Sequence, residues 1–402
     1  MVAFLALAAL LPALAAAVPC VQFDAQFNLY AFGGEEDVNL GPSSSWSSPS
    51  PKPLSSVGRP PWTGTNSQCL LSQSNNAVYV IGADAADATS VYIYDIVGDK
   101  WSKQTTSGGP TSVGNSRSSA VLDHDTNVLF TISDTAYSLD LGLITNTAAG
   151  TAAWTTVGTP PFPVADYKGT AALASNHILY FGVPSTPAGS ANLFVIHYNY
   201  FQPQAQAYPA VGGSNFPDSA GQTTSFLVQN NTVPYQVLYV PNDFSNSYVV
   251  THYTDPASFN VTTGSPMPAS LINSTQILPP PTSKDTNAAY AASDSSIVQI
   301  DTKGDIYYIA NAVSSWQVAP GASWSKLSYS LKPATATTSA TASGASSSAP
   351  GATKTGAKGE ASSSGAAASS TGAASAAAPA LARKDIVGFA LGCAAVVAAV
   401  VL

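Results

Sequence analysis

The sequence predicts an all-β protein in which a pair of strands repeats along the chain. Apolar residues alternate with polar ones or stand in runs of four, a pattern typical of strands and not of amphipathic helices. Gly, Pro, Ser, Thr and Asn are abundant between these runs. The runs recur about every 50 to 60 residues, which indicates a repeat architecture.

The chain ends precede and follow this repeat region. Residues 2–17 form an apolar run that ends in Ala15-Ala16-Ala17, as a secretory signal peptide does, and we expect cleavage before Val18. Residues 386–402 are apolar to the last residue, with a short spacer and small residues upstream. This order is typical of a glycosylphosphatidylinositol (GPI) attachment signal. We expect residues 376–402 to be removed and the lipid to be attached at Ser375, with Gly372 as the alternative; a membrane-spanning helix is the competing interpretation.

Residues 333–375 consist almost entirely of Ala, Ser, Thr, Gly and Pro. Such a composition offers too little apolar surface to offset the entropy of ordering, so we expect a disordered, O-glycosylated stalk. Residues 18–332 remain as one large β domain.

Two cysteines and three sequons fit an extracellular location. Once the tail is removed, Cys20 and Cys69 are the remaining cysteines, and we expect them to form a disulfide in an oxidising compartment. N-glycosylation sequons begin at Asn230, Asn260 and Asn273. The mature protein should therefore be a glycoprotein on the outer face of the plasma membrane or in a cell wall.

Charge excludes some partners. Only 9% of the residues are charged and the net charge is −8, without a basic cluster. This argues against a nucleic acid or an anionic membrane surface as partner. We expect glycans to contribute to solubility.

Self-comparison defines the repeat. Aligning Cys20 with Cys69 also places Tyr30 on Tyr79 and Gly33 on Gly82. Further units follow, and an aromatic residue tends to come after the second run of each unit. These residues are expected to pack between units: Trp101, Trp154, Tyr208, Phe259 and Trp316. A period near 50 with paired strands predicts a β-propeller, with six blades preferred and seven possible.

Tyr94-Asp95 followed by Trp101, behind the strand that ends at Gly82, resembles a kelch repeat, the unit also found in galactose-oxidase-type propellers. The resemblance extends over about residues 20–330, but the paired glycine of the family occurs only at Gly33-Gly34. In such a ring, a Cys20–Cys69 disulfide would join the first two blades and contribute roughly 3–4 kcal/mol.

The resemblance also raises the question of copper-oxidase chemistry, which requires two histidine ligands, two tyrosines and a cross-linked cysteine. The four histidines, His124, His177, His197 and His252, are far apart in the sequence, and both cysteines are expected to be paired. We therefore do not expect a copper site. No named catalytic motif occurs in the chain, and no catalytic or cofactor-binding residue is assigned.

Acidic clusters offer weak metal candidates. Glu35, Glu36 and Asp37 follow a strand and could hold Ca²⁺, although a solvated charged loop is the simpler interpretation. Asp123-His124-Asp125 and Asp301–Asp305 are expected to be turns. Aromatic residues in loops could stack on sugars, but we expect Trp46, Trp62, Phe162 and Tyr167 to be packed instead.

We therefore expect a GPI-anchored extracellular propeller that binds a protein or cell-wall polysaccharide without catalysis. The alternative is a carbohydrate-active enzyme with its site at the mouth of the central channel.

Overall fold

The computed structural model describes residues 17–111, 113, 116–229, 233–253 and 267–335. Their regular elements are β-strands and three short 3₁₀ turns, which confirms the all-β prediction. Within these ranges, no helix has the length and apolar character needed to cross a membrane. The 3₁₀ turns are η1 (Ser43–Ser45), η2 (Ile196–Tyr198) and η3 (Ala269–Leu271).

The strands follow one another as antiparallel meanders of four. The first meander contains β1 (Cys20–Phe23), β2 (Leu29–Phe32), β3 (Val38–Gly41) and β4 (Lys52–Pro53). The second contains β5 (Gln68–Ser72), β6 (Ala77–Ile81), β7 (Val91–Asp95) and β8 (Lys100–Ser107). The third contains β9 (Ala120–Leu122), β10 (Val128–Ile132), β11 (Ala136–Asp140) and β12 (Thr151–Gly158). Strands β8 and β12 pair in parallel and join the second and third meanders.

The second half of the domain repeats this plan with insertions. Its fourth meander contains β13 (Ala171–Ala174), β14 (His177–Tyr180), β15 (Ser190–Val195) and an outer strand in two pieces, β16 (Tyr200–Phe201) and β17 (Gln206–Ala207). The fifth contains β18 (Gly221–Ser225), β19 (Gln236–Pro241), β20 (Ser247–Thr251) and β21 (Ser274–Leu278). The last contains β22 (Ala289–Ala292), β23 (Ile297–Ile300), β24 (Asp305–Ile309) and β27 (Ser325–Ser330), with the inserted hairpin β25 (Val313–Ser314) and β26 (Gln317–Val318).

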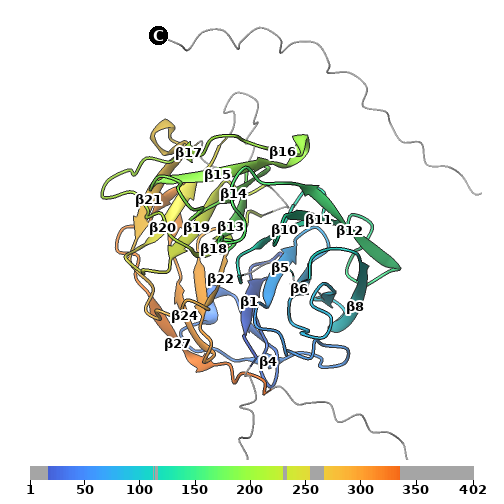
Figure 1. Cartoon of the computed structure of the whole chain (residues 1–402). Helices are drawn as coiled ribbons and strands as arrows, with labels where there is room; N and C mark the ends of the chain where they lie inside the picture. Colours follow the sequence, from blue (N-terminus) through green and yellow to red (C-terminus); the bar gives the residue numbers. More distant parts are fainter. Residues whose placement is uncertain (1–16, 112, 114–115, 230–232, 254–266, 336–402) are drawn as a thin grey trace, which may run out of the picture. The chain divides into compact units, whose positions relative to one another are not determined.

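The first strand of each meander lies at the centre of a ring. Strands β1, β5, β9, β13, β18 and β22 contact one another in that order, and β22 returns to contact β1 (Figure 1). Where neighbouring first strands or their extensions pair, as in the bridge between Phe226 and Ala292, they run parallel. This is a propeller-like arrangement, in which each sheet buries its faces against its neighbours.

The two ends of the domain meet in the first meander. Gly34 forms an antiparallel bridge with Pro333, and the amide of Ala334 donates to the carbonyl of Gly33 at 3.0 Å. The amide of Ala17 donates in turn to the carbonyl of Ala334 at 2.8 Å. Gly34 is needed here, because a Cβ would lie 2.5 Å from the carbonyl oxygen of Glu36. Folded contacts thus extend to Ala334, two residues beyond Lys332.

Cys20 and Cys69 form the expected disulfide. The bond joins β1 to β5, the central strands of the first two meanders, with the two Cα atoms 5.9 Å apart. Both residues are buried among apolar side chains of those meanders. The disulfide therefore reinforces the ring next to the place where its ends meet.

The repeated aromatic residues pack as predicted in most units. Trp101 of the second meander lies edge-on to Phe32 of the first, with ring centroids 5.6 Å apart. Trp154 and Tyr208 are also buried, and Phe259 lies outside the described residues. Trp316 differs, because it is only half-buried. The loop aromatics for which we expected packing are all buried: Trp46, Trp62, Phe162 and Tyr167.

Candidate functional site

The ring has two faces, and one of them carries the candidate site. Because the meanders are antiparallel, the connections from first to second strand and from third to fourth strand open on the same side. We call this side the exit face, since the central strands end there. The pocket described next is built from these connections in the last two meanders.

A pocket of about 290 Å³ lies between the fifth and sixth meanders on the exit face. Phe226 and Tyr235 border it from the β18–β19 connection, Asp294 from the β22–β23 connection, and Trp316 from the β25–β26 hairpin. Gln236 and Ser315 add polar groups to its wall. Aromatic faces with a few polar groups are the usual lining of a small-ligand site, and the volume is at the lower end for such sites.

Trp316 is held in the pocket by a strained turn. The pairing of Ser314 with Gln317 leaves Ser315 and Trp316 as a two-residue hairpin loop, and their φ angles are 48° and 71°. Two positive φ values define a type I′ turn, which favours Asn and Gly. A tryptophan in this conformation costs on the order of 1 kcal/mol or more, and such strain is concentrated at functional sites.

The backbone of the hairpin is fixed by two glutamines. The carbonyl of Trp316 accepts hydrogen bonds from Nε2 of Gln236 at 3.0 Å and from Nε2 of Gln276 at 2.8 Å. Oε1 of Gln276 accepts the amide of Val318 at 2.9 Å. Strands β19 and β21 thus position the indole, so the pocket is preorganised.

Two tyrosines form the wall behind the indole. The ring centroid of Tyr235 lies 5.9 Å from that of Trp316 and 5.0 Å from that of Tyr253. Burial, with smaller effects of Tyr253 and Asp125, raises the pKa of Tyr235 to about 12. The phenol therefore stays neutral at physiological pH and contributes a flat, uncharged surface.

Among the described residues that line this pocket, Asp294 is the one that carries a charge. It is exposed at the tip of the tight turn from Ser293 to Ser296, and its Oδ1 accepts the hydroxyl of Ser295 at 3.0 Å. Within the described part of the chain, no Lys, Arg or His forms an ion pair with it. The pocket is thus aromatic with one unneutralised carboxylate.

The central channel offers much less space. Its cavity is about 80 Å³ and is lined by residues from all six central strands. Ser67 Oγ and His124 Nδ1 line or face this cavity without a hydrogen-bond partner among the described atoms. A cavity of this size holds a few water molecules and not a sugar ring. At the mouth opposite the exit face, Arg117 donates to the carbonyls of Pro19, Ser67 and Asn287 and joins three meanders.

The acidic residues proposed for calcium do not converge on one point. Glu35 is exposed and pairs with Lys332 at 2.6 Å, whereas Asp37 is buried and pairs with Arg59 at 3.0 Å. Burial raises the pKa of Asp37 to about 6, against the opposing effects of Arg59 and nearby amides. Glu36 is exposed. Within the described residues, no three His, Cys, Asp or Glu side chains could hold a metal ion together.

The other acidic clusters form turns, as expected. Oδ1 of Asp301 accepts the amides of Lys303 and Asp305 in the hairpin before β24. Asp123 accepts the hydroxyl of Thr126 in the turn between β9 and β10. Asp123 is buried rather than solvated.

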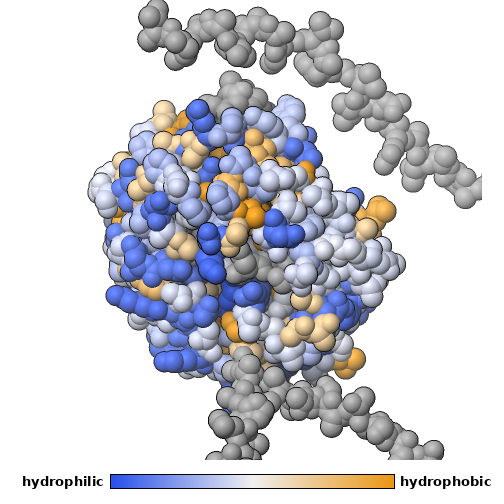
Figure 2. Space-filling view, viewed as in Figure 1, coloured by the Kyte–Doolittle hydropathy of each residue, from blue (hydrophilic) through white to orange (hydrophobic). Residues whose placement is uncertain are grey.

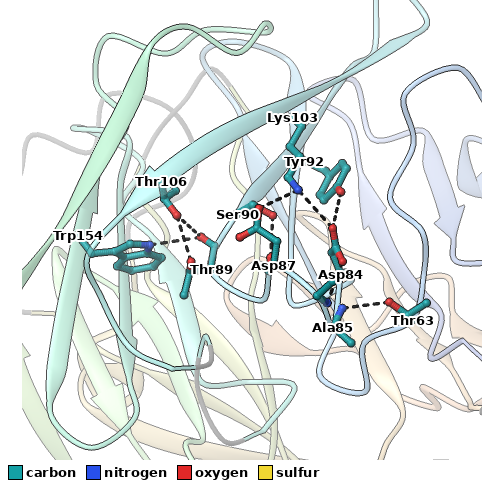
Figure 3. Close-up of polar contacts among 11 residues, drawn as sticks. Thr63, Asp84, Ala85, Asp87, Thr89, Ser90, Tyr92, Lys103, Thr106 and Trp154 are labelled. Atoms are coloured by element: carbon teal, nitrogen blue, oxygen red, sulfur yellow. Dashed lines mark hydrogen bonds and ion pairs between the residues drawn. The ribbon is translucent and has the colours of Figure 1, made fainter. Parts of the chain in front are cut away.

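A denser polar network lies beside β7 and β8 (Figure 3). Lys103 Nζ lies 2.8 Å from an oxygen of Asp87 and 3.3 Å from one of Asp84, which also accepts the hydroxyl of Tyr92 at 2.8 Å. In the connection between β6 and β7, the carbonyl of Thr89 accepts a hydrogen bond from the indole N–H of Trp154. Because these groups satisfy one another, the network shapes the β6–β7 connection.

The structure brings together two histidines that are distant in sequence. The ring centroids of His177 and His252 lie 4.9 Å apart, and His252 Nδ1 lies 2.9 Å from the hydroxyl of Tyr208. Burial lowers the pKa of both histidines, that of His252 to about 3. All three side chains are buried, so they serve packing between the fourth and fifth meanders.

One predicted glycosylation site can be placed. Oδ1 of Asn273 accepts the amide of Tyr253 at 3.0 Å, which leaves Nδ2 as the atom that would carry a glycan. Asn230, Asn260, Gly372 and Ser375 lie outside the described residues.

Comparison with known proteins assigns no family. No protein-family model matches the chain, and no curated protein matches it. Among solved structures, the chain is similar to a streptogramin B lyase with 11% sequence identity and a TM-score of 0.39, over 80% of this chain and 86% of that chain. A likeness at this level carries no argument about activity.

Proposed function

We propose that this chain is a GPI-anchored, kelch-like propeller with six blades that binds a cell-wall polysaccharide on the outside of the cell. The observation that carries the binding proposal is the strained Trp316, which borders an aromatic pocket. Sugars present apolar faces of C–H groups that pack on aromatic rings, while their hydroxyls bond to polar side chains at the rim. Asp294 and Ser315 supply such groups here.

Surface composition is consistent with an extracellular glycoprotein. In Figure 2 most of the visible surface is hydrophilic or intermediate, and hydrophobic side chains form small separate patches. Only 9% of the residues are charged. Glycans at the sequons and on the stalk would bind the water that a surface with so few charged side chains does not bind.

A protein is the second candidate partner. Val97, Leu143 and Tyr198 are 82%, 96% and 83% exposed, and they stand on the third-to-fourth-strand connections of three successive meanders. These connections also open on the exit face. Exposed apolar side chains on one face favour contact with another macromolecule.

An enzymatic role at the channel mouth has less support. The 80 Å³ cavity is too small for a sugar ring, and Asp37 and Glu35 are each held in a separate ion pair, with Arg59 and Lys332 respectively. We therefore place the ligand in the exit-face pocket and propose binding without catalysis.

The test is an array of cell-wall polysaccharides and oligosaccharides probed with the full-length glycoprotein, with and without EDTA. We expect retention on a defined glycan that EDTA does not abolish. No binding to any glycan of the array would contradict the polysaccharide proposal and favour a protein partner. Release of the protein from intact cells by a phosphatidylinositol-specific phospholipase tests the anchor separately.

A further inference from the structure

The pocket also points to the charge of its ligand. We infer that it accepts a sugar carrying a protonated amino group, that is, a hexosamine whose nitrogen is not acetylated. This inference rests on the proposed glycan binding and specifies the ligand class of the same site.

The first step is the unneutralised carboxylate. Asp294 borders the pocket and is exposed, and its Oδ1 accepts a hydrogen bond from the neutral hydroxyl of Ser295. Other acidic residues of the described chain form ion pairs, as Asp37 does with Arg59 and Glu35 with Lys332, whereas Asp294 forms none there. A cation that enters the pocket would therefore meet a carboxylate that is available for an ion pair.

The second step is the aromatic surface beside that carboxylate. Phe226, Tyr235 and Trp316 border the same cavity of about 290 Å³. The face of an aromatic ring attracts an ammonium group, most strongly in the case of tryptophan, and the attraction grows when the group is partly desolvated. Because the pKa of Tyr235 is raised, the phenol contributes no competing negative charge.

The third step is the selectivity that follows. An anionic sugar would be repelled by Asp294, and no basic residue borders the pocket among those described to offset the repulsion. A neutral or N-acetylated sugar would gain only stacking and hydrogen bonds. A sugar with an ammonium group gains these and also the ion pair and the cation–π contact.

The experiment uses the full-length glycoprotein and two matched ligands, a glucosamine tetramer and the same tetramer fully N-acetylated. We expect the free-amine tetramer to bind about tenfold more tightly, that is, by about 1.4 kcal/mol, with the ion pair to Asp294 as the main source of the preference. Asp294→Asn should reduce this preference to about twofold or less. Because Asp294 is exposed, the variant should keep the melting temperature of the parent.

Several outcomes would overturn the inference. Equal binding of the two tetramers, or an unchanged preference in Asp294→Asn, would mean that the carboxylate of Asp294 does not distinguish a free amine from an acetylated one. Binding of a lysine-rich peptide in place of either tetramer would show that the amine comes from a protein. In the first two cases glycan binding itself would stand; binding of no sugar at all would instead contradict the proposed function.

Discussion

The rings of Tyr235 and Trp316 meet with their centroids 5.9 Å apart and their planes inclined by 64°. The two residues are 81 positions apart in the sequence and belong to neighbouring meanders. Their contact makes one aromatic wall from two repeat units. The predictions below concern this wall, the turn that carries it and the ring that supports both.

Relief of the strained turn should stabilise the protein. Ser315→Asn introduces a residue that tolerates a positive φ, so we expect the free energy of unfolding to rise by roughly 0.5–1 kcal/mol. Ser314→Asn, one residue earlier in β25, is the matched control and should not stabilise. Chemical denaturation measures both variants; equal effects would show that the turn is not strained.

Acid should destabilise the fold through buried histidine. The pKa of His252 falls from 6.5 to about 3 on folding, so below pH 6.5 the unfolded chain takes up a proton that the folded chain excludes. The contribution is thus fully present above pH 6.5 and is lost as the pH falls towards 3. At pH 5 the part of this contribution that has been lost amounts to about 2 kcal/mol.

Denaturation at pH 7 and pH 5 measures this loss. His252→Gln should reduce the difference between the two pH values, although it also lowers stability at pH 7 by removing the contact with Tyr208. His197→Gln is the control, because His197 is exposed. An unchanged pH dependence in His252→Gln would assign the acid sensitivity to other groups.

Loss of the disulfide should weaken the whole ring. The bond closes a loop of 49 residues, and Cys20→Ser together with Cys69→Ser is expected to cost about 4 kcal/mol in the chain-entropy description. The comparison is made by chemical denaturation of the parent and the double variant. A change below 1 kcal/mol would mean that the contacts between β1 and β5 suffice without the bond.

Glycosylation at Asn273 should be detectable by mass. Because Oδ1 is held by the amide of Tyr253, Nδ2 can carry a glycan without loss of that hydrogen bond. Asn273→Gln should therefore remove the mass of one N-glycan from the secreted protein. An unchanged glycan mass would show that the site is not used.

The fold could be predicted because residues with a structural role recur at matching positions of successive repeats. Cys20 and Cys69 occupy equivalent places on two central strands, and the strands after them carry Tyr30 and Tyr79. Alternation and turn residues defined most strands. The two-piece outer strand β16–β17 and the hairpin β25–β26 were missed, because short insertions leave no periodic signal.

The candidate site could not be predicted in this way. Trp316 stands where other repeats carry a buried aromatic residue. From its sequence position alone, it is therefore expected to pack between units as those residues do. The available signal was the unusually long connection between Ile309 and Ser325 with Ser-Trp at its tip. The partners Tyr235, Asp294 and Gln276 come from separate connections and strands, so only the closed ring brings them together.

The most direct test of the account is a calorimetric titration of the glycan identified on the array, with the parent protein, Trp316→Ala and Tyr198→Ala. Tyr198 is an exposed aromatic residue outside the pocket, at the tip of another connection that opens on the exit face. We expect Trp316→Ala to weaken binding at least tenfold, by about 1.4 kcal/mol or more, and Tyr198→Ala to leave it unchanged. Parent-like affinity in a folded Trp316→Ala would contradict the assignment of this pocket as the binding site.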